Sequence, residues 1–202
     1  MLSIEHKGAG GEAVRIHLSD GSFFVVHAEV HARAGLAAGD SLDAPRIESL
    51  CSQSQLIFAR AKALRLLAAA PQTRRGLAAK LRARGFPEDA VRAAITRMTE
   101  LGYLDDLAFA ESWTLSRLAS RKEGWKALYK RLLLKGVARD VAEKAVAGLC
   151  TDEVELARAR ELAGSLSAQA AARKLASRGF RSRTIARLLK EIRERGRAGD
   201  AE

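Results

Sequence analysis

The first part of the chain alternates between apolar and polar positions. In residues 12–30, apolar residues recur at every second position on both sides of Asp20-Gly21. Such a dipeptide between two alternating runs is typical of a tight hairpin turn, because both central positions need a positive φ. The pattern therefore predicts a β-hairpin, with a third short strand beginning near Leu42. A sheet this small needs another element to pack against.

From Ser54 onward the apolar residues follow a helical period, and the pattern occurs three times. Each copy contains a glycine that follows a basic residue, at Gly85, Gly136 and Gly179. Apolar residues stand 6, 9, 10 and 13 positions after each glycine, which is one face of an α-helix. We expect each glycine to end a helix in the left-handed conformation, with the base before it near the negative helix end.

These glycines, with Thr73, Thr151 and Ser167 as candidate N-caps, divide the chain into helix triplets. We expect a mostly α protein: a small β-rich N-terminal extension in residues 1–45, then three tandem three-helix repeats in residues 46–202. The expected helices are 54–70, 73–84 and 87–101, then 105–120, 123–135 and 138–149, then 152–164, 167–178 and 181–195. Such triplets should stack into an elongated, curved body, and a compact bundle of nine helices is the alternative.

The charge is basic and unevenly distributed. The chain has 35 Lys and Arg against 24 Asp and Glu, a net charge of +11. Residues 1–50 hold four bases and seven acids, so all of the positive excess lies in the helical part. A basic body is suited to a polyanion or an acidic protein face. The N-terminus has no cleavable signal pattern and no apolar run is long enough to span a membrane, so we expect a cytoplasmic protein.

Four motifs follow one another in the helical part. They are Thr73-Arg-Arg-Gly-Leu-Ala-Ala-Lys-Leu81, Leu101-Gly-Tyr-Leu-Asp-Asp106 with Phe109-Ala110 after it, Arg121-Lys-Glu-Gly124 leading to Leu132-Leu-Leu-Lys-Gly-Val137, and Arg173-Lys-Leu-Ala-Ser-Arg-Gly-Phe180. In this order, over residues 54–195, the chain resembles the RecX family, bacterial regulators of the recombinase RecA. Gly76 departs from the family pattern, which usually has an acidic residue there to close a capping box.

The resemblance implies a protein with no chemistry of its own and no cofactor. RecX-like proteins bind the RecA–DNA filament in its helical groove and reduce its ATPase, recombinase and coprotease activities. The RecA filament is therefore the expected partner, with single- or double-stranded DNA as a further contact and no membrane. We expect a monomer.

The candidate contact residues come from the charges alone, not from the resemblance. Bases recur on the second helix of every repeat, and ten bases with only two acids lie between Arg173 and Arg197. The candidates are Arg173, Lys174, Arg178, Arg181, Arg183 and Arg187 in the third repeat, Lys126, Lys130, Arg131 and Lys135 in the second, and Arg74, Arg75, Lys80, Arg82 and Arg84 in the first.

The remaining constellations favour structural roles. Asp105-Asp106 fits a helix start, and all four histidines precede residue 32, where no third metal ligand accompanies them. We therefore predict no catalytic or metal-binding residues. Trp125 and Tyr129 are the best aromatic contact candidates, although packing is the favoured interpretation. Two alternatives remain: a direct DNA-binding protein built from helix-turn-helix-like modules, and a nuclease, for which the acids are too scattered.

Overall fold

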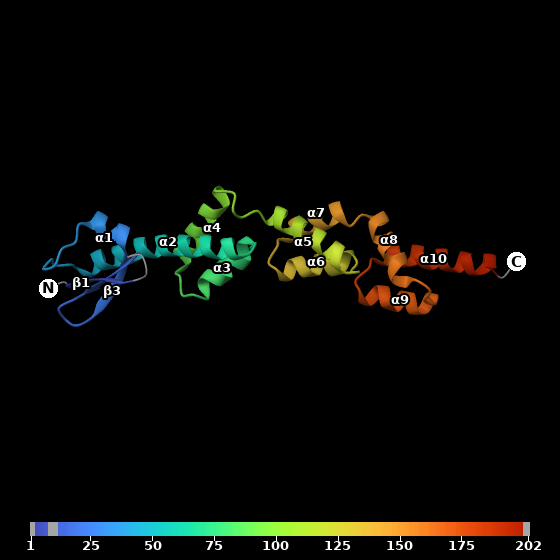
Figure 1. Ribbon diagram of the computed structural model, residues 1–202, viewed down its shortest axis with the longest axis horizontal. Helices are drawn as coiled ribbons and strands as arrows, with labels where there is room; N and C mark the ends of the chain where they lie inside the picture. Colours follow the sequence, from blue (N-terminus) through green and yellow to red (C-terminus); the bar gives the residue numbers. More distant parts are fainter. Residues whose placement is uncertain (1–2, 8–11, 200–202) are drawn as a thin grey trace. The chain divides into compact units, whose positions relative to one another are not determined.

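The computed structural model describes residues 3–7 and 12–199, and its contacts divide the chain into two compact units (Figure 1). The first unit comprises the residues up to 72 together with 76–104, and the second comprises 73–75 and the residues from 105 onward. The described part of the chain forms three strands and ten helices. None of these helices is both long enough and apolar enough to cross a bilayer.

The first unit begins with a three-stranded antiparallel sheet in the order β1-β2-β3. Its strands are β1 (Ser3–Lys7), β2 (Ala13–His17) and β3 (Phe23–His27). Strands β2 and β3 form the predicted hairpin, but the expected two-residue turn is wrong: the loop covers residues 18–22, and Asp20 has no positive φ whereas Gly21 has a φ of 86°. The position predicted for the third strand is wrong, because that strand precedes the hairpin and no strand begins at Leu42. The isolated Ile4, which pairs with Ile16, gave too short a pattern to be recognised.

Two helices near the N-terminus differ from the expectation, one that was not predicted and one that begins earlier than predicted. Strand β3 ends at His27, and helix α1 (Ala28–Ala34) follows directly, so residues 28–30 are helical and not strand. The His27 Nδ1 accepts the Glu29 amide at 3.2 Å and caps the start of α1. Helix α2 (Ala44–Ala69) begins ten residues before the predicted start, with the Asp43 carboxylate accepting the Arg46 amide at 2.9 Å. A carboxylate cap followed by a proline in the first turn favours a helix start, which explains this position.

Helix α2 packs against the sheet and also forms part of the first repeat. Val14, Ile16 and Val26 of the sheet are fully buried against Leu50 of α2. The Ser54 hydroxyl, buried on the same helix, accepts the His27 amide at 3.0 Å and donates to the Leu50 carbonyl at 2.7 Å. The small sheet is therefore stabilised by the helix that also belongs to the neighbouring repeat.

The first repeat consists of α2, α3 (Arg74–Arg82) and α4 (Glu88–Glu100). Leu77 and Leu81 of α3 are fully buried in its core. Val91 and Met98 of the predicted apolar quartet on α4 are buried there too, and Ile95 is partly buried at the edge. The helical periodicity thus identified the face of α4 that forms the core.

The second unit contains the other two three-helix repeats. Their helices are α5 (Asp106–Ser120), α6 (Trp125–Leu134) and α7 (Arg139–Leu149), then α8 (Asp152–Ala163), α9 (Ala168–Ser177) and α10 (Ser182–Gly199). Thr151 and Ser167 cap α8 and α9 as predicted, accepting the amides of Val154 and Ala170. Each repeat has its own buried cluster, one around Leu132 and one around Leu175. The fold is mostly α with three tandem three-helix repeats, as expected.

Candidate functional site

The second helix of every repeat ends in the same way. The glycines at 85, 136 and 179 have φ values of 81°, 88° and 75°. The amide after each glycine donates to the carbonyl of a leucine five residues earlier; the pairs are Phe86 with Leu81, Val137 with Leu132, and Phe180 with Leu175. These bonds form a Schellman motif, which confirms that glycine ends each helix and leaves the preceding base at its negative end.

The end of α9 contacts the start of α6 within the second unit. The Gly124 amide donates to the Arg178 carbonyl at 3.0 Å, and the Lys126 amide donates to the Gly179 carbonyl at 2.9 Å. A Cβ atom added to Gly124 would lie 2.3 Å from the Phe180 Cα, so only glycine fits there. The second helices of the second and third repeats are therefore joined backbone to backbone.

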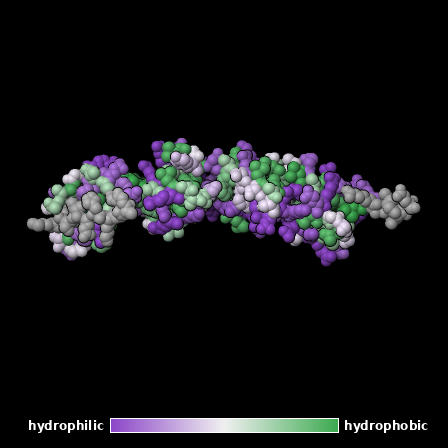
Figure 2. Space-filling view, viewed as in Figure 1, coloured by the Kyte–Doolittle hydropathy of each residue, from purple (hydrophilic) through white to green (hydrophobic). Residues whose placement is uncertain are grey.

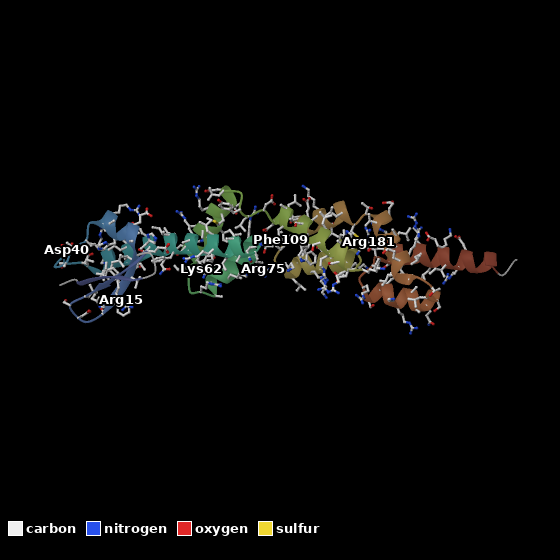
Figure 3. All side chains as sticks on the ribbon, in the orientation of Figure 1. Arg15, Asp40, Lys62, Arg75, Phe109 and Arg181 are labelled. Atoms are coloured by element: carbon white, nitrogen blue, oxygen red, sulfur yellow. The ribbon has the colours of Figure 1, made fainter. Side chains whose placement is uncertain are left out.

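Glu155 of α8 lies beside this junction and is fully buried. Its carboxylate accepts the Trp125 amide at 2.8 Å, the Arg181 amide at 3.1 Å and the Arg181 Nε at 2.6 Å. The Thr184 hydroxyl donates to it as well, at 2.5 Å. One buried charge thus supplies the caps of two helix starts, α6 and α10, and fixes the third repeat to the second. Figure 3 shows Arg181 ahead of α10.

Several of the candidate cations have acidic partners. Arg181 is only 16% exposed and contacts Asp152 at 2.8 Å in addition to Glu155. The other pairs are Arg82 with Glu88 at 2.7 Å, Arg131 with Glu123 at 3.1 Å, Arg183 with Asp152 at 2.6 Å, and Arg187 with Glu191 at 4.0 Å. The Arg82 guanidinium holds the pKa of the Glu88 carboxyl below its ordinary value. These cations help to stabilise their own repeats.

Other candidates contact neutral groups. Lys80 donates to the Gln72 side chain at 2.8 Å, Arg84 donates to the Lys80 carbonyl at 2.7 Å, and the Lys135 ammonium lies 5.7 Å from the centre of the Trp113 ring. Arg74 and Arg75 are exposed at the start of α3; Figure 3 shows Arg75 on that helix. Some bases of the first repeat therefore already contact neighbouring groups of the chain, whereas others are exposed.

Among the candidates of the second and third repeats, Lys130, Arg173, Lys174 and Arg178 are exposed and their side chains make no hydrogen bond, ion pair or ring contact within residues 12–194; Lys126 is exposed too and contacts only a hydroxyl. Lys126 and Lys130 lie one turn apart on α6, and Lys174 and Arg178 lie one turn apart at the end of α9. Because the end of α9 is bonded to the start of α6, these two pairs adjoin the same junction. We call Lys126, Lys130, Lys174 and Arg178 the basic row. In Figure 2, hydrophilic side chains cover much of the visible face around α8 and α9.

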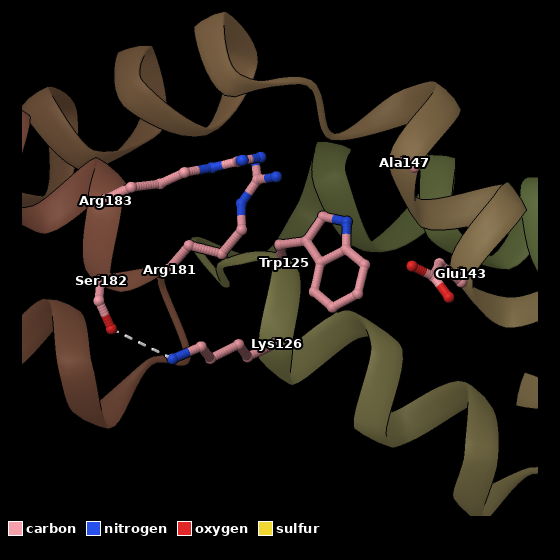
Figure 4. A pocket seen from close by; sticks show the side chains of 7 residues that line it. All are labelled: Trp125, Lys126, Glu143, Ala147, Arg181, Ser182 and Arg183. Carbon is pink, nitrogen blue, oxygen red and sulfur yellow. Dashed lines mark hydrogen bonds between the residues drawn. The ribbon is translucent and has the colours of Figure 1, made fainter.

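A cleft of about 510 Å³ opens beside the junction. Figure 4 shows the guanidinium groups of Arg181 and Arg183 close together above Trp125, while the Lys126 ammonium points to the Ser182 hydroxyl at 3.4 Å. Glu143 lies on the opposite wall. The indole ring of Trp125 stacks on Tyr129 with centroids 5.0 Å apart, and both rings pack against the core of the second repeat. Packing, the favoured interpretation of this aromatic pair, is confirmed.

The remaining sequence motifs have structural roles. The Asp105 carboxylate accepts the amides of Leu107 and Ala108 at 2.8 and 3.0 Å and caps α5, as predicted. Asp106 is buried and accepts the Arg74 amide at 2.8 Å. Sequence reasoning missed this bond and the role of Glu155, because each joins residues about thirty positions apart. Among the side chains that the structure describes, no cluster of three His, Cys, Asp or Glu residues could hold a metal ion.

Two segments of the chain match RecX family domains: residues 59–98 match the first three-helix domain and residues 105–146 match the second. A regulatory protein RecX from Thermobifida fusca is 40% identical over 125 residues, which cover 62% of this chain and 67% of that protein. A regulatory protein RecX from Mycolicibacterium vanbaalenii is 44% identical over 91 residues, which cover 45% of this chain and 50% of that protein. Thus the chain matches from half to two thirds of the length of these relatives.

Two crystal structures share the fold. A regulatory protein RecX superposes with a TM-score of 0.69 at 23% identity, covering 94% of this chain and 98% of that one. RecX from Lactobacillus salivarius superposes with a TM-score of 0.63 at 24% identity, covering 68% and 96%. The tandem three-helix arrangement is therefore shared with these proteins.

Proposed function

This chain belongs to the RecX family, and on that premise we propose that it binds the RecA–DNA filament in its helical groove and inhibits the ATPase, recombinase and coprotease activities of RecA. The relatives it matches are named regulatory proteins, and the chain is a RecX-like regulatory protein. A filament is a repeating polymer with DNA phosphates along its axis. A chain of tandem helical repeats offers it a series of similar contacts.

The observation that carries the proposal is the basic row at the junction of α6 and α9. Its four cations are exposed and no acid in residues 12–194 neutralises them, so they remain available to phosphates or to carboxylates of a partner. The backbone bonds of the junction and the buried Glu155 hold the two helices in a fixed relation. Pre-ordered cations lose less entropy on binding than cations on a flexible segment.

The geometry favours a binding role over catalysis. The buried acids of the second unit accept hydrogen bonds from helix starts and guanidinium groups, and Thr184 donates to one of them. Glu155 accepts four hydrogen bonds, so this carboxylate is poorly placed to move a proton for a substrate. On this proposal, inhibition arises from occupation of the groove.

A titration of the DNA-dependent ATPase of RecA with the purified chain tests this function. We expect inhibition at substoichiometric to near-equal ratios of the chain to RecA. A variant with Lys130→Glu, Lys174→Glu and Arg178→Glu should raise the half-inhibitory concentration about tenfold or more, or about 1.4 kcal/mol of binding energy. A matched variant with Arg139→Glu, Lys144→Glu and Arg193→Glu, three other exposed cations of the same two repeats, should inhibit like the wild type.

An unchanged ATPase over a wide titration with the wild-type chain would contradict the proposed function. Equal inhibition by the two triple variants, with unchanged helical circular dichroism, would remove the basic row from the contact surface. Direct binding to bare single- or double-stranded DNA is the second candidate function, favoured by the same exposed cations. It predicts binding to an oligonucleotide without RecA, at least as tight as binding to the filament and weakening steeply with salt.

A further inference from the structure

One apolar surface of the first unit forms an open cleft. A cleft of about 630 Å³ lies between the end of α2 and the loop after α4, lined by Leu64, Leu67, Ala68, Pro71 and Tyr103, with Ala69 and Ala70 beside them. We call this the α2–Tyr103 cleft. Leu64 is 43% exposed and Tyr103 is 58% exposed. Exposed apolar side chains that gather around a cleft mark interaction sites more often than scattered ones do.

The backbone holds Tyr103 in this exposed position. Gly102 has a φ of 75°, and the Tyr103 amide donates to the Met98 carbonyl at 2.9 Å, so α4 ends in the same Schellman motif as the second helices. At the corresponding position of two such motifs, Val137 is 3% exposed and Phe180 is 2% exposed, because each packs back on its own repeat. Tyr103 lacks this packing, and its ring faces solvent in an ordered turn.

The spacing along α2 describes the shape of what would fit. Leu64, Leu67 and Ala68 stand at positions i, i+3 and i+4 of α2, so they lie on one face of the helix. Pro71 follows the end of α2, where Ala70 is extended, and lines the same cleft. A short apolar surface of this kind matches the apolar face of a short partner helix. Tyr103 closes one side of this surface and adds an aromatic anchor of the kind that dominates interface energies.

The charge around the cleft limits the chemistry of that helix. The chain contains no acid between Glu48 and Glu88. Arg60 lies one turn before Leu64 on the same face of α2, and Arg65 directly follows Leu64 in sequence; both are exposed. The acid at the end of α4, Glu100, is already paired with Arg97 at 3.2 Å. The α2 side of the rim is therefore positive, and it favours carboxylates beside the apolar surface of the partner. On the other side the exposed Asp105, two residues after Tyr103, already accepts the amides that begin α5.

From this apolar, positively rimmed groove we propose that the α2–Tyr103 cleft receives an amphipathic helix of the RecA protein, with an apolar stripe flanked by Asp or Glu. The inference rests on the proposed function and adds a contact that involves protein and not DNA. The chain would then bind the filament through two different surfaces: cations of the second unit and an apolar cleft of the first.

The test compares two pairs of exposed apolar residues. In one variant Leu64 and Tyr103 become Gln, and in the matched control Leu115→Gln and Leu134→Gln replace side chains that are 54% and 78% exposed outside the cleft. Binding of each chain is measured to RecA filaments assembled on an oligonucleotide with a slowly hydrolysed ATP analogue, and separately to the bare oligonucleotide. We expect the cleft variant to bind the filament about tenfold more weakly, as for the loss of a small hot spot. We expect its affinity for bare DNA to stay within about twofold of wild type, and the control to match wild type in both assays.

The outcomes separate the cleft from the proposed function. If the wild-type chain binds filaments but the cleft and control variants bind equally well, the cleft proposal fails and the function stands. If the wild-type chain does not bind filaments, both fail. If the cleft variant loses affinity for bare DNA to the same degree, the cleft contacts nucleic acid and the proposal is overturned. A wild-type dimer that the cleft variant converts to monomers, seen by analytical ultracentrifugation, would identify a second copy as the occupant and would also overturn it.

A charge variant keeps the test decisive if the apolar substitutions unfold the chain. Arg60→Glu and Arg65→Glu leave the apolar surface intact and reverse the rim. Filament binding should weaken about tenfold at low salt, with a smaller effect as salt screens the rim. Unchanged filament binding by this variant would contradict the acidic partner helix.

Discussion

Replacing Glu155 with Ala should destabilise the second unit more than any other single loss of an acid there. The substitution leaves the Trp125 and Arg181 amides without their acceptor and leaves the Arg181 guanidinium with Asp152 as its remaining acidic contact. Breaking a buried ion pair costs about 3–5 kcal/mol, and an unsatisfied buried donor costs about 1–3 kcal/mol. Since Asp152 still neutralises part of the charge, we expect a loss of about 4 kcal/mol in the free energy of unfolding.

The two tryptophans make the measurement specific. Trp113 and Trp125 both lie in the second repeat, so fluorescence during urea unfolding reports on the second unit. With a slope of about 2 kcal/mol per M, the loss corresponds to a midpoint about 2 M lower. Glu155→Gln keeps the shape of the side chain and one carbonyl acceptor, so about half of the effect should remain.

Glu161→Ala is the matched control. Glu161 is an exposed acid on the same helix and contacts Lys122 at 3.5 Å, so its loss should change the unfolding free energy by no more than about 0.5 kcal/mol. If Glu155→Ala and Glu161→Ala shift the midpoint equally, the buried carboxylate does not hold the two repeats together and the reasoning is wrong.

Gly124→Ala should lower the free energy of unfolding by about 2–3 kcal/mol in the same urea assay, because its Cβ would overlap the Phe180 backbone. Gly148→Ala, with open space around its Cβ, should stabilise α7 slightly, and equal midpoints of the two variants would refute the close approach at Gly124. Burial raises the pKa of the Cys150 thiol to about 11, so at pH 8 a disulfide reagent should label the half-buried Cys51 well before Cys150, and equal rates would contradict this burial. The thiol of the unfolded chain releases its proton near pH 9, whereas the folded thiol keeps it until about pH 11. The contribution of Cys150 to the free energy of unfolding should therefore be complete below pH 9 and lost as the pH rises through 11. Urea midpoints measured from pH 8 to 11 will show this loss.

Local patterns predicted the helices of the second unit because several of them carry their own start or stop signal. Thr151 and Ser167 cap their helices with side chains three residues from the bonded amide, and Gly136 and Gly179 end theirs with bonds that span five residues. Such short-range features are visible in a linear sequence. The start of α2 shows the limit, because Asp43 followed by Ala-Pro fits a helix start as well as a loop.

The candidate site was less predictable than the helices, because the sequence shows where the cations are but not which of them form ion pairs in the folded chain. Arg178 and Arg181 are three residues apart and looked equivalent, yet Arg178 is exposed and Arg181 is largely buried against Glu155. The difference depends on an acid about 26 positions away that only the packing of α8 brings near. The exposure of Tyr103 was likewise not predictable, because the same motif buries Val137 and Phe180 at the corresponding position.

The carboxylate that the third repeat provides to the start of α6 makes these modules poor candidates for exchange. A chimera that combined this second repeat with a third repeat from elsewhere would need an acid at the place of Glu155 and a tight backbone turn opposite Gly124. Truncation after Cys150 would also weaken the second repeat, because the start of α6 would lose the Glu155 carboxylate that accepts the Trp125 amide. Shorter or longer arrays made from this chain should therefore be divided in a surface loop inside a repeat, so that the second and third repeats keep their shared junction.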